Sequence, residues 1–102
     1  MNTNREIYRK EYNFGADIMI AVCDKELIGK SFEDGGLFLK VTESFYKGEE
    51  ITESELKASL KYATIANLVG ERTVKCALDN AFIEEANVIS VAGVPHAQIV
   101  KL

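Results

Sequence analysis

The residues in this sequence best suited to chemistry are the thiol of Cys23, the carboxyl group of Asp24 and the imidazole of His96. His96 is the one histidine of the chain and directly follows its one proline, in the stretch GVPHAQIV at 93–100. A thiolate beside an imidazole can act as a nucleophile, with the histidine as its base. Cys23 ends one predicted strand and His96 begins the last one, so the two would approach each other if those strands were antiparallel neighbours.

Each of the three residues also has a structural interpretation. Cys23 follows an apolar run, and a free cysteine commonly behaves as a small buried hydrophobe. Asp24 can cap the short turn KELIG at 25–29. His96 can bond to the backbone or to Asp24 at the edge of a turn, and a lone histidine seldom catalyses without a partner that orients it. We therefore assign no catalytic residue, and Cys23, Asp24 and His96 remain candidates for a small enzyme.

Other familiar chemistries lack their signatures. A zinc site needs about four ligands at recognisable spacing, which one histidine and two cysteines 53 positions apart do not supply. The glycines form neither a phosphate loop nor a dinucleotide fingerprint. We expect no metal and no cofactor, and we expect Cys23 and Cys76 to be free thiols.

A second candidate chemistry is the stacking of nucleic-acid bases on aromatic side chains next to a cation. Lys10 lies between Tyr8 and Tyr12 on one face of a predicted strand, the most basic and aromatic surface that the chain offers. The stretch FYK at 45–47 resembles a stacking platform for single-stranded nucleic acid. The alternative is that the aromatic pair fills the core at a sheet edge.

Composition and charge narrow the classes of partner. The chain of 102 residues has a net charge of −4, with 47% hydrophobic and 27% charged residues, as in an ordinary globular domain. Residues 1–14 carry three basic and two acidic groups, for +1, and the rest carry nine basic and fourteen acidic groups, for −5. This balance argues against extensive wrapping of DNA. The longest apolar run, at 18–23, is too short to cross a membrane, and the charged start has no signal-peptide core, so we expect a cytoplasmic protein.

Five segments have the apolar patterns typical of strands: 7–12, 17–23, 37–42, 88–92 and 96–102. The first two should form a hairpin, and the last two should be joined by a tight turn at Gly93–Pro95. We interpret 30–36 and 43–50 as loops.

Two helices are predicted in the middle of the chain. Thr52 and Glu55 form a capping-box pattern that begins a helix over 53–63, and apolar spacing predicts a second helix over 65–79. Gly70 costs about 1 kcal/mol inside a helix relative to alanine, so either the helices break near Thr64 or something packs closely against Gly70. The order β-β-β-α-α-β-β predicts an α+β two-layer sandwich: a mostly antiparallel sheet of about five strands with two helices on one face. We predict one domain over 1–102, with 1–15 as an N-terminal arm or edge strand.

The sequence resembles a small archaeal family defined by a domain of unknown function. The resemblance covers about residues 16–102 and rests on the stretches AVCDKELIGKSFEDGGLFLKVTESFYKGEE, ATIANLVGE and NVISVAGVPHAQIV. It implies an archaeal cytoplasmic protein of α+β type, for which an RNA-binding or translation-associated role has been suggested. The family motifs fall on Cys23, Asp24, Gly29, Phe45, Tyr46, Gly48, Asn67, Gly70, His96 and Gln98.

These observations favour a non-catalytic binding module, with RNA or a translation-associated protein as partner. The binding candidates are Lys10, Tyr46, Lys47, Asn67, His96 and Gln98. The alternatives are the small enzyme described above and a protein-interaction or dimerisation module whose edge strand pairs with another chain, so a monomer and a homodimer both stay open.

Overall fold

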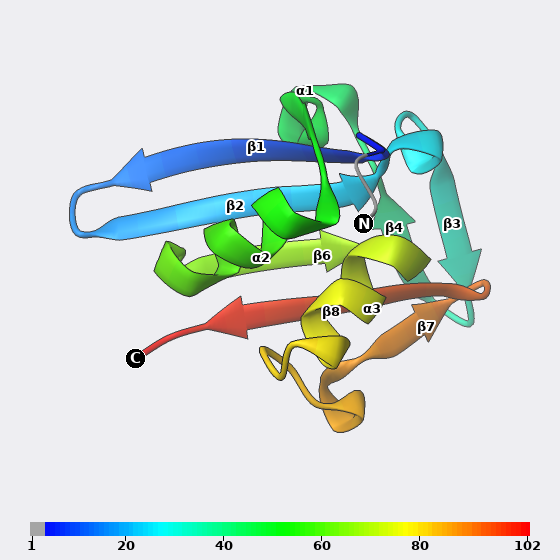
Figure 1. Ribbon diagram of the computed structural model, residues 1–102. Coiled ribbons are helices and arrows are strands. Elements are labelled where there is room, and N and C mark those ends of the chain that lie inside the picture. The colour runs from blue at the N-terminus through cyan, green and yellow to red at the C-terminus, as the bar shows by residue number, and fades with distance from the viewer. Residues whose placement is uncertain (1–3) are drawn as a thin grey trace.

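The computed structural model describes residues 4–102, which form a six-stranded sheet, a separate two-stranded hairpin and three α-helices (Figure 1). The large sheet has the order β5-β1-β2-β6-β8-β7, and β3 pairs with β4. The strands are β1 Ile7–Phe14, β2 Asp17–Asp24, β3 Ser31–Asp34, β4 Leu37–Lys40, β5 Glu49–Ile51, β6 Ile65–Val69, β7 Ile89–Val91 and β8 Val94–Val100. The helices are α1 Glu43–Tyr46, α2 Glu53–Tyr62 and α3 Glu71–Asp79, with 3₁₀ turns at Lys25–Leu27 and Glu85–Asn87.

The predicted α+β class with a mostly antiparallel sheet is confirmed, although within residues 4–102 the large sheet has six strands rather than about five. β1 and β2 form the expected hairpin, with β1 extended to Phe14 and β2 extended to Asp24. β2 and β6 are parallel, because the chain between them returns through α2 on one side of the sheet. β1 lies between β5 and β2 over residues 7–9, whereas no strand of residues 4–102 pairs with the outer side of residues 10–14, so β1 is an edge strand only in that second part.

Helices α2 and α3 cover one face of the large sheet and enclose the main core (Figure 1). Successive strand residues point to opposite faces, so Ile20, Val22 and Leu68 meet the helices. They are fully buried together with apolar residues of both helices, including Leu56, Leu60, Val74 and Ala77. Burying a side chain of this size contributes about 2 kcal/mol. Because α2 and α3 cover this face, the sheet can offer a binding surface only on its other face or at its edges.

The β3–β4 hairpin and α1 cover part of the opposite face. Tyr8, Cys23 and Val69 lie there in a second buried cluster, with Leu39, Val41, Tyr46 and Val91 above them. This cover lies over the C-terminal ends of β2 and β6, at the right of Figure 1. The remainder of that face, toward the β1–β2 turn, has no such layer.

The prediction of a helix over 65–79 is wrong for its first part, because Ile65–Val69 form the central strand β6. Leu68 and Val69 are both fully buried, one on each face of the sheet, so the apolar run carries no strand alternation. Gly70, with a φ of 107°, separates the strand from α3. The loops predicted at 30–36 and 43–50 are also wrong in part, since they contain β3, α1 and the start of β5.

The last hairpin turns one or two residues earlier than predicted. Ala92 and Gly93 have φ values of 51° and 82°, and β8 begins at Val94, so His96 is the third residue of the strand rather than the first. Pro95 lies inside β8 opposite Gly70. The Gly70 carbonyl accepts instead from the Val74 N–H in the first turn of α3, at 2.9 Å. The N–H that Pro95 lacks therefore leaves no strand carbonyl unpaired.

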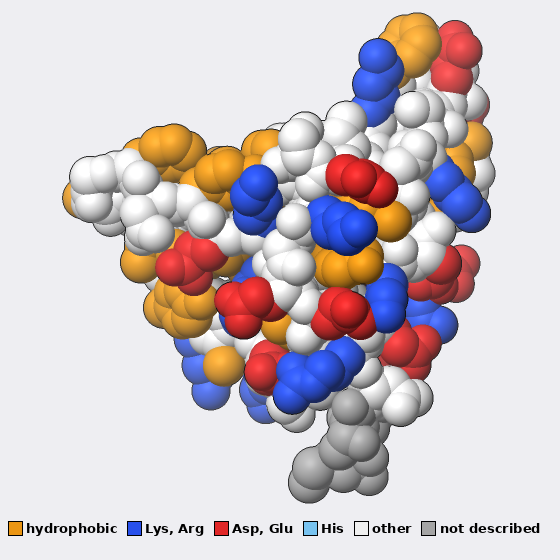
Figure 2. Space-filling model, turned by 90° about the horizontal axis from the view of Figure 1, so that it is seen from above, with side chains coloured by type: hydrophobic (Ala, Val, Ile, Leu, Met, Phe, Trp, Pro, Cys, Tyr) orange, Lys and Arg blue, Asp and Glu red, His pale blue; other side chains and the backbone are white. Residues whose placement is uncertain are grey.

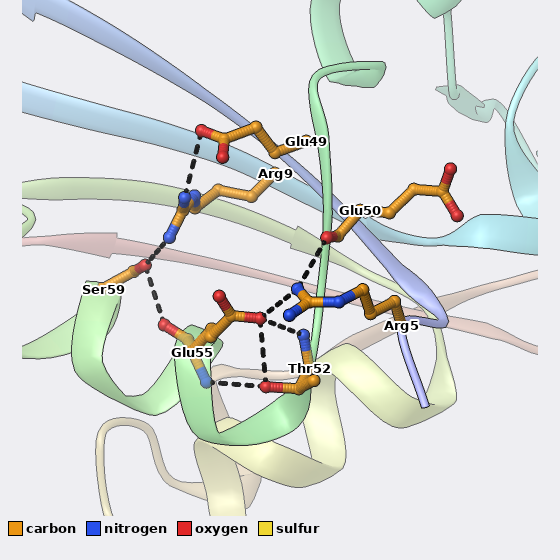
Figure 3. Close-up of polar contacts among 7 residues, drawn as sticks. All are labelled: Arg5, Arg9, Glu49, Glu50, Thr52, Glu55 and Ser59. Atoms are coloured by element: carbon orange, nitrogen blue, oxygen red, sulfur yellow. Dashed lines mark hydrogen bonds and ion pairs between the residues drawn. The ribbon is translucent and has the colours of Figure 1, made fainter. Parts of the chain in front are cut away.

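The edge strand β5 is held to α2 by a network of polar contacts (Figure 3). The predicted capping box is present: the Thr52 hydroxyl accepts from the Glu55 N–H at 3.2 Å, and Glu55 accepts from the Thr52 N–H at 3.0 Å. Arg5 donates to Glu55 Oε1 at 2.6 Å and to the Glu50 carbonyl at 3.2 Å. Arg9 donates to the Ser59 hydroxyl at 2.6 Å. These contacts fix the outer strand on its helix.

Candidate functional site: the open face of the sheet

Part of the sheet face opposite the helices is exposed to solvent and brings together several predicted binding residues. The strand registers place Lys10, Ala21, Asn67 and Gln98 in one row across β1, β2, β6 and β8. The next row consists of Tyr12, Met19, Ile65 and Val100. We define the open face as Phe14, Met19, Ile65, Asn67, His96, Gln98 and Val100, all of which are exposed or half-buried.

The molecule is hollowed on this side. Seen from above in Figure 2, hydrophobic side chains gather on the arm that the β1–β2 hairpin forms, and the outline is indented between it and a second projecting arm. Phe14 and Val100 contribute to the apolar surface, with 56% and 64% of their area exposed. A face of this shape and composition can accept a flat or extended ligand.

A stack of three aromatic rings borders the open face. The Tyr12 ring lies 5.4 Å from that of Phe45, with 25° between the planes, and 6.3 Å from that of Phe14, with 3° between the planes. The Tyr12 hydroxyl fixes the stack by donating to the Phe45 carbonyl at 2.8 Å. Because Phe14 is the exposed end, the stack offers a ring to which another π-system can be added.

Lys10 places a cation at this stack. Its Nζ lies 5.6 Å from the centroid of the Tyr12 ring and donates to the Ser44 carbonyl at 2.7 Å. The predicted pairing of Lys10 with aromatic side chains therefore occurs with Tyr12, whereas Tyr8 is buried at 8% exposure. Such a cation–π contact contributes about 0.5–1 kcal/mol at an exposed site.

Asn67 and Gln98 form an amide pair in the middle of the open face. They are cross-strand partners, and Gln98 Nε2 donates to Asn67 Oδ1 at 2.8 Å. Asn67 Nδ2 has a weak acceptor, Met19 Sδ, at 3.8 Å. The pair thus presents an N–H donor and the Gln98 carbonyl to whatever lies on the face.

His96 lies at the border of the open face, one row from the amide pair. Its Nδ1 is 2.9 Å from the Leu68 carbonyl. A carbonyl oxygen can only accept, so Nδ1 carries a proton, and in a neutral ring Nε2 is an acceptor. His96 is half-buried beside a hollow of about 330 Å³ that Asn87, Ile89 and Gln98 help to line. It adds a third hydrogen-bonding group to the face.

The structure does not bring Cys23, Asp24 and His96 together. Cys23 and Asp24 are successive residues of β2 and point to opposite faces. Val69 of β6 lies between Cys23 and His96 in the same row, which separates them by two strand spacings, about 10 Å. Cys23 is fully buried, and burial, with the nearby charges of Asp24 and Glu26, raises its pKa to about 12. A thiol in this state is not an activated nucleophile at neutral pH.

The two binding candidates within the FYK stretch, Tyr46 and Lys47, lie in different environments. Lys47 is exposed after α1, whereas Tyr46 is 5% exposed within the second core cluster. Burial also raises the pKa of Tyr46 to about 12. The Tyr46 ring therefore packs against the sheet, and Phe14, which lies beyond the strand predicted over 7–12, supplies the exposed ring instead.

Asp24 caps a helix, but the helix is α3 rather than the turn that follows Asp24. Its carboxylate accepts from the Arg72 N–H at 3.0 Å, the Thr73 N–H at 2.9 Å and the Thr73 hydroxyl at 2.8 Å. Of the two alternatives for Gly70, close packing occurs, because a Cβ on Gly70 would lie 2.4 Å from Asp24 Cγ, although Gly70 precedes α3 rather than lying inside a helix. No local pattern links residues 24 and 73, so sequence reasoning missed this role.

A hollow of about 320 Å³ lies beside this cap, with Glu26 and Arg72 in its wall. Three of its four charged side chains, all except Glu71, are already paired within the protein. Arg72 Nη2 contacts Glu6 at 2.9 Å, and Arg72 Nη1 donates to Glu26 at 2.8 Å. The Asp24 carboxylate accepts from the backbone N–H groups in the first turn of α3. This hollow therefore offers fewer unpaired groups than the open face.

Two further classes of site have no basis in the part of the chain that the structure describes. Residues 4–102 contain no group of three or more His, Cys, Asp or Glu side chains placed to hold a metal ion. Among the helices in this range, none is long and apolar enough to cross a membrane.

The fold and the face together define a small α+β domain with an open-faced mixed sheet. Residues 12–102 match the family described as protein of unknown function (DUF424), and the chain belongs to this family, which confirms the resemblance. An uncharacterised conserved protein from the archaeon Methanopyrus kandleri has a similar crystal structure, with a TM-score of 0.74 and 23% identity over 94% of this chain and 93% of that chain. This similarity supports the fold. No curated protein sequence matches the chain.

Proposed function

We propose that the chain is a non-catalytic binding module and that its open face binds single-stranded RNA. The observation that carries the proposal is the stack Phe45–Tyr12–Phe14, which ends on an exposed ring. Any nucleobase can extend such a stack, because every base has a π-face, and one stacked base contributes about 1–3 kcal/mol. The family resemblance implies an RNA-binding or translation-associated role, and co-sedimentation with ribosomes tests the second of these.

The groups beside the stack support the same ligand class. Asn67 and Gln98 present amide donors and acceptors, and His96 presents a ring nitrogen, all of which can bond to the edges of unpaired bases. Unpaired bases expose those edges, whereas a duplex hides them. The arrangement therefore favours single-stranded segments over double helices.

Local charge is compatible with an anionic ligand even though the chain as a whole carries −4. A carboxylate borders the open face: Asp17, the cross-strand partner of Phe14, which accepts from the Thr64 hydroxyl at 3.1 Å. Among the described residues in the cross-strand rows of the open face, Lys10 is the one cation, so the face can neutralise few phosphates. The expected complex is thus short and of modest affinity, with a shallow salt dependence.

The test is fluorescence anisotropy of a labelled oligouridylate of about ten nucleotides, within the usual site size for such modules. Phe14→Ala should weaken binding roughly tenfold, the loss of about 1.4 kcal/mol of stacking. The matched control is Tyr62→Ala, since Tyr62 lies on α2 with 44% of its area exposed. This control should bind as the parent chain does.

A second pair of variants tests the electrostatic part. Lys10→Ala should weaken binding and reduce the slope of log affinity against log salt by about 0.7, whereas Lys57→Ala on the exposed side of α2 should change neither. Equal losses in Phe14→Ala and Tyr62→Ala, or an affinity no better than that for heparin, would refute RNA binding by this face. A protein captured in place of RNA would assign the face to a different class of partner.

A further inference from the structure

The outer edge of β8 is only partly paired. β7 pairs with Val94, Pro95 and His96, and no strand of the described chain lies beside the edge from Ala97 to Val100. In Figure 1 this is the stretch of β8 that continues to the left of β7 toward the C-terminal label. Unpaired edges of this kind are templates for another strand.

The hydrogen bonds to β6 determine which groups of β8 point outward. The Gly70 N–H donates to the Pro95 carbonyl, and the Lys101 N–H donates to the Thr64 carbonyl, at 2.9 Å and 2.8 Å. The register between them is regular, so Ala97 and Ile99 also face β6. The N–H and C=O groups of Gln98 and Val100 must therefore point away from the sheet.

The two ends of the sheet differ in how they are protected against pairing with another chain. The opposite end consists of β5 and the part of β1 beyond Arg9. It carries charged side chains: Glu49 and Glu50, which pair with Arg9 and Lys25, and then Lys10 and Glu11. β8 contains no Asp, Glu, Lys or Arg from Val94 to Val100. Lys101 follows it, but its Nζ donates to the Leu60 and Lys61 carbonyls of α2, at 2.9 Å and 3.3 Å. For a chain with a net charge of −4, β8 is the edge where two copies meet without like-charge repulsion.

We propose that the free edge of β8 pairs with β8 of a second copy of this chain, antiparallel and with the two-fold axis at Ile99. Gln98 then lies opposite Val100 of the second copy, and the outward groups of these two residues form four backbone hydrogen bonds across the axis. The exposed Val100 side chain packs beside the stem of Gln98 from the second copy, in the plane of the open face. The large sheets of the two copies then form one continuous sheet.

The space beside this edge fits the end of the second strand. In this register, Lys101 of the second copy lies opposite Ala97, and Leu102 turns out of the strand because Ile89 of β7 already pairs with His96. The hollow of about 330 Å³ lined by Asn87, Ile89 and Ala97 lies at that point. Leu102 is fully exposed in a single chain, and Ile89 is 48% exposed, so the pairing covers apolar surface on both sides.

The interface is small, below the roughly 1,200 Å² of a stable complex, so we expect a weak dimer that forms in the high-micromolar range. Sedimentation velocity from low-micromolar to millimolar chain concentration measures it. Val100→Pro removes an outward N–H that has no partner within one chain, and should abolish the dimer while the monomer stays folded. Val100→Thr keeps the N–H and is the matched control, which should dimerise as the parent chain does.

Amide hydrogen exchange gives an independent readout of the same edge. The amides of Gln98 and Val100 should exchange rapidly in dilute solution and slowly at high concentration, while those of Ala97 and Ile99 stay protected throughout. A monomer at millimolar concentration, or a dimer that survives Val100→Pro, would overturn the proposal. Slow exchange of Gln98 and Val100 that requires an added extended peptide, with no dimer, would overturn it as well and assign the edge to another protein. Neither result bears on RNA binding by single chains.

Discussion

Gly70→Ala should destabilise the protein by more than the usual cost of an alanine at positive φ. Gly70 has a φ of 107°, and its missing Cβ leaves room for the Asp24 carboxylate, which is 3% exposed. An alanine there costs at least about 1 kcal/mol, because a φ of 107° with a ψ of 159° is a backbone region that glycine alone adopts readily. Its Cβ also pushes the carboxylate off the first turn of α3, where a hydrogen bond to a charged group contributes about 1.5–3 kcal/mol. The expected loss is about 3 kcal/mol in the free energy of unfolding.

The chain offers a control that separates these two costs. Gly93 has a φ of 82°, and no atom lies within 4 Å of a Cβ built on it, so Gly93→Ala pays the backbone cost alone. Urea unfolding measured by circular dichroism should give about 1 kcal/mol for Gly93→Ala and about 3 kcal/mol for Gly70→Ala. In thermal unfolding, Gly70→Ala should lower the melting temperature by about 12–20 °C.

A double-mutant cycle tests the cause directly. With the carboxylate removed by Asp24→Ala, Gly70→Ala should cost only about 1 kcal/mol, which gives a coupling energy of about 2 kcal/mol between the two positions. Additive losses, or a Gly70→Ala variant no less stable than Gly93→Ala, would refute the assignment of Asp24 as the cap of α3.

Two further predictions concern stability. Cys23 and Tyr46 have pKa values raised to about 12 from 9.0 and 10.0, so in alkaline solution the folded chain keeps protons that the unfolded chain loses. The free energy of unfolding should therefore fall by up to roughly 1.4 kcal/mol per pH unit and group between pH 9 and 12. Urea titrations across this range measure the fall, and a free energy of unfolding that stays constant would contradict it. Thr52→Ala should cost about 1 kcal/mol in urea unfolding, whereas Thr42→Ala, at an N-cap without a side-chain bond, should cost little; equal losses would argue against the capping box.

Sequence reasoning succeeded where the determinants of structure are local. The hairpin of β1 and β2 follows from two apolar segments and a turn, and α2 follows from the Thr52–Glu55 box. β6 was missed because its residues also fit a helical spacing, and because its last two residues, Leu68 and Val69, are buried on opposite faces and break the alternation. Residues 65–69 form a strand rather than a helix because they pair with β2 and β8, which are distant in the sequence.

The same limit applies to the candidate site. Lys10, Asn67 and Gln98 were chosen singly, and only the register of four strands shows that they share one row. Phe14 was missed because an Asn-Phe-Gly stretch is typical of a turn, although the alternation Tyr8, Tyr12, Phe14 was a signal that β1 continues. Cys23 and Asp24 were grouped because they are adjacent, but adjacency in a strand puts side chains on opposite faces.

The central position of β6 also determines how the chain can fold. β1–β2 and β7–β8 are hairpins of neighbouring segments and can form early, but β6 alone joins the two halves of the large sheet. Its contact with β2 closes a long segment: the Ile18 N–H meets the Thr64 hydroxyl 46 residues away. Because the entropy of that closure is lost before the contacts form, docking of β6 is the slow step. Substitutions in β6 therefore slow folding, whereas substitutions in β7 mainly accelerate unfolding.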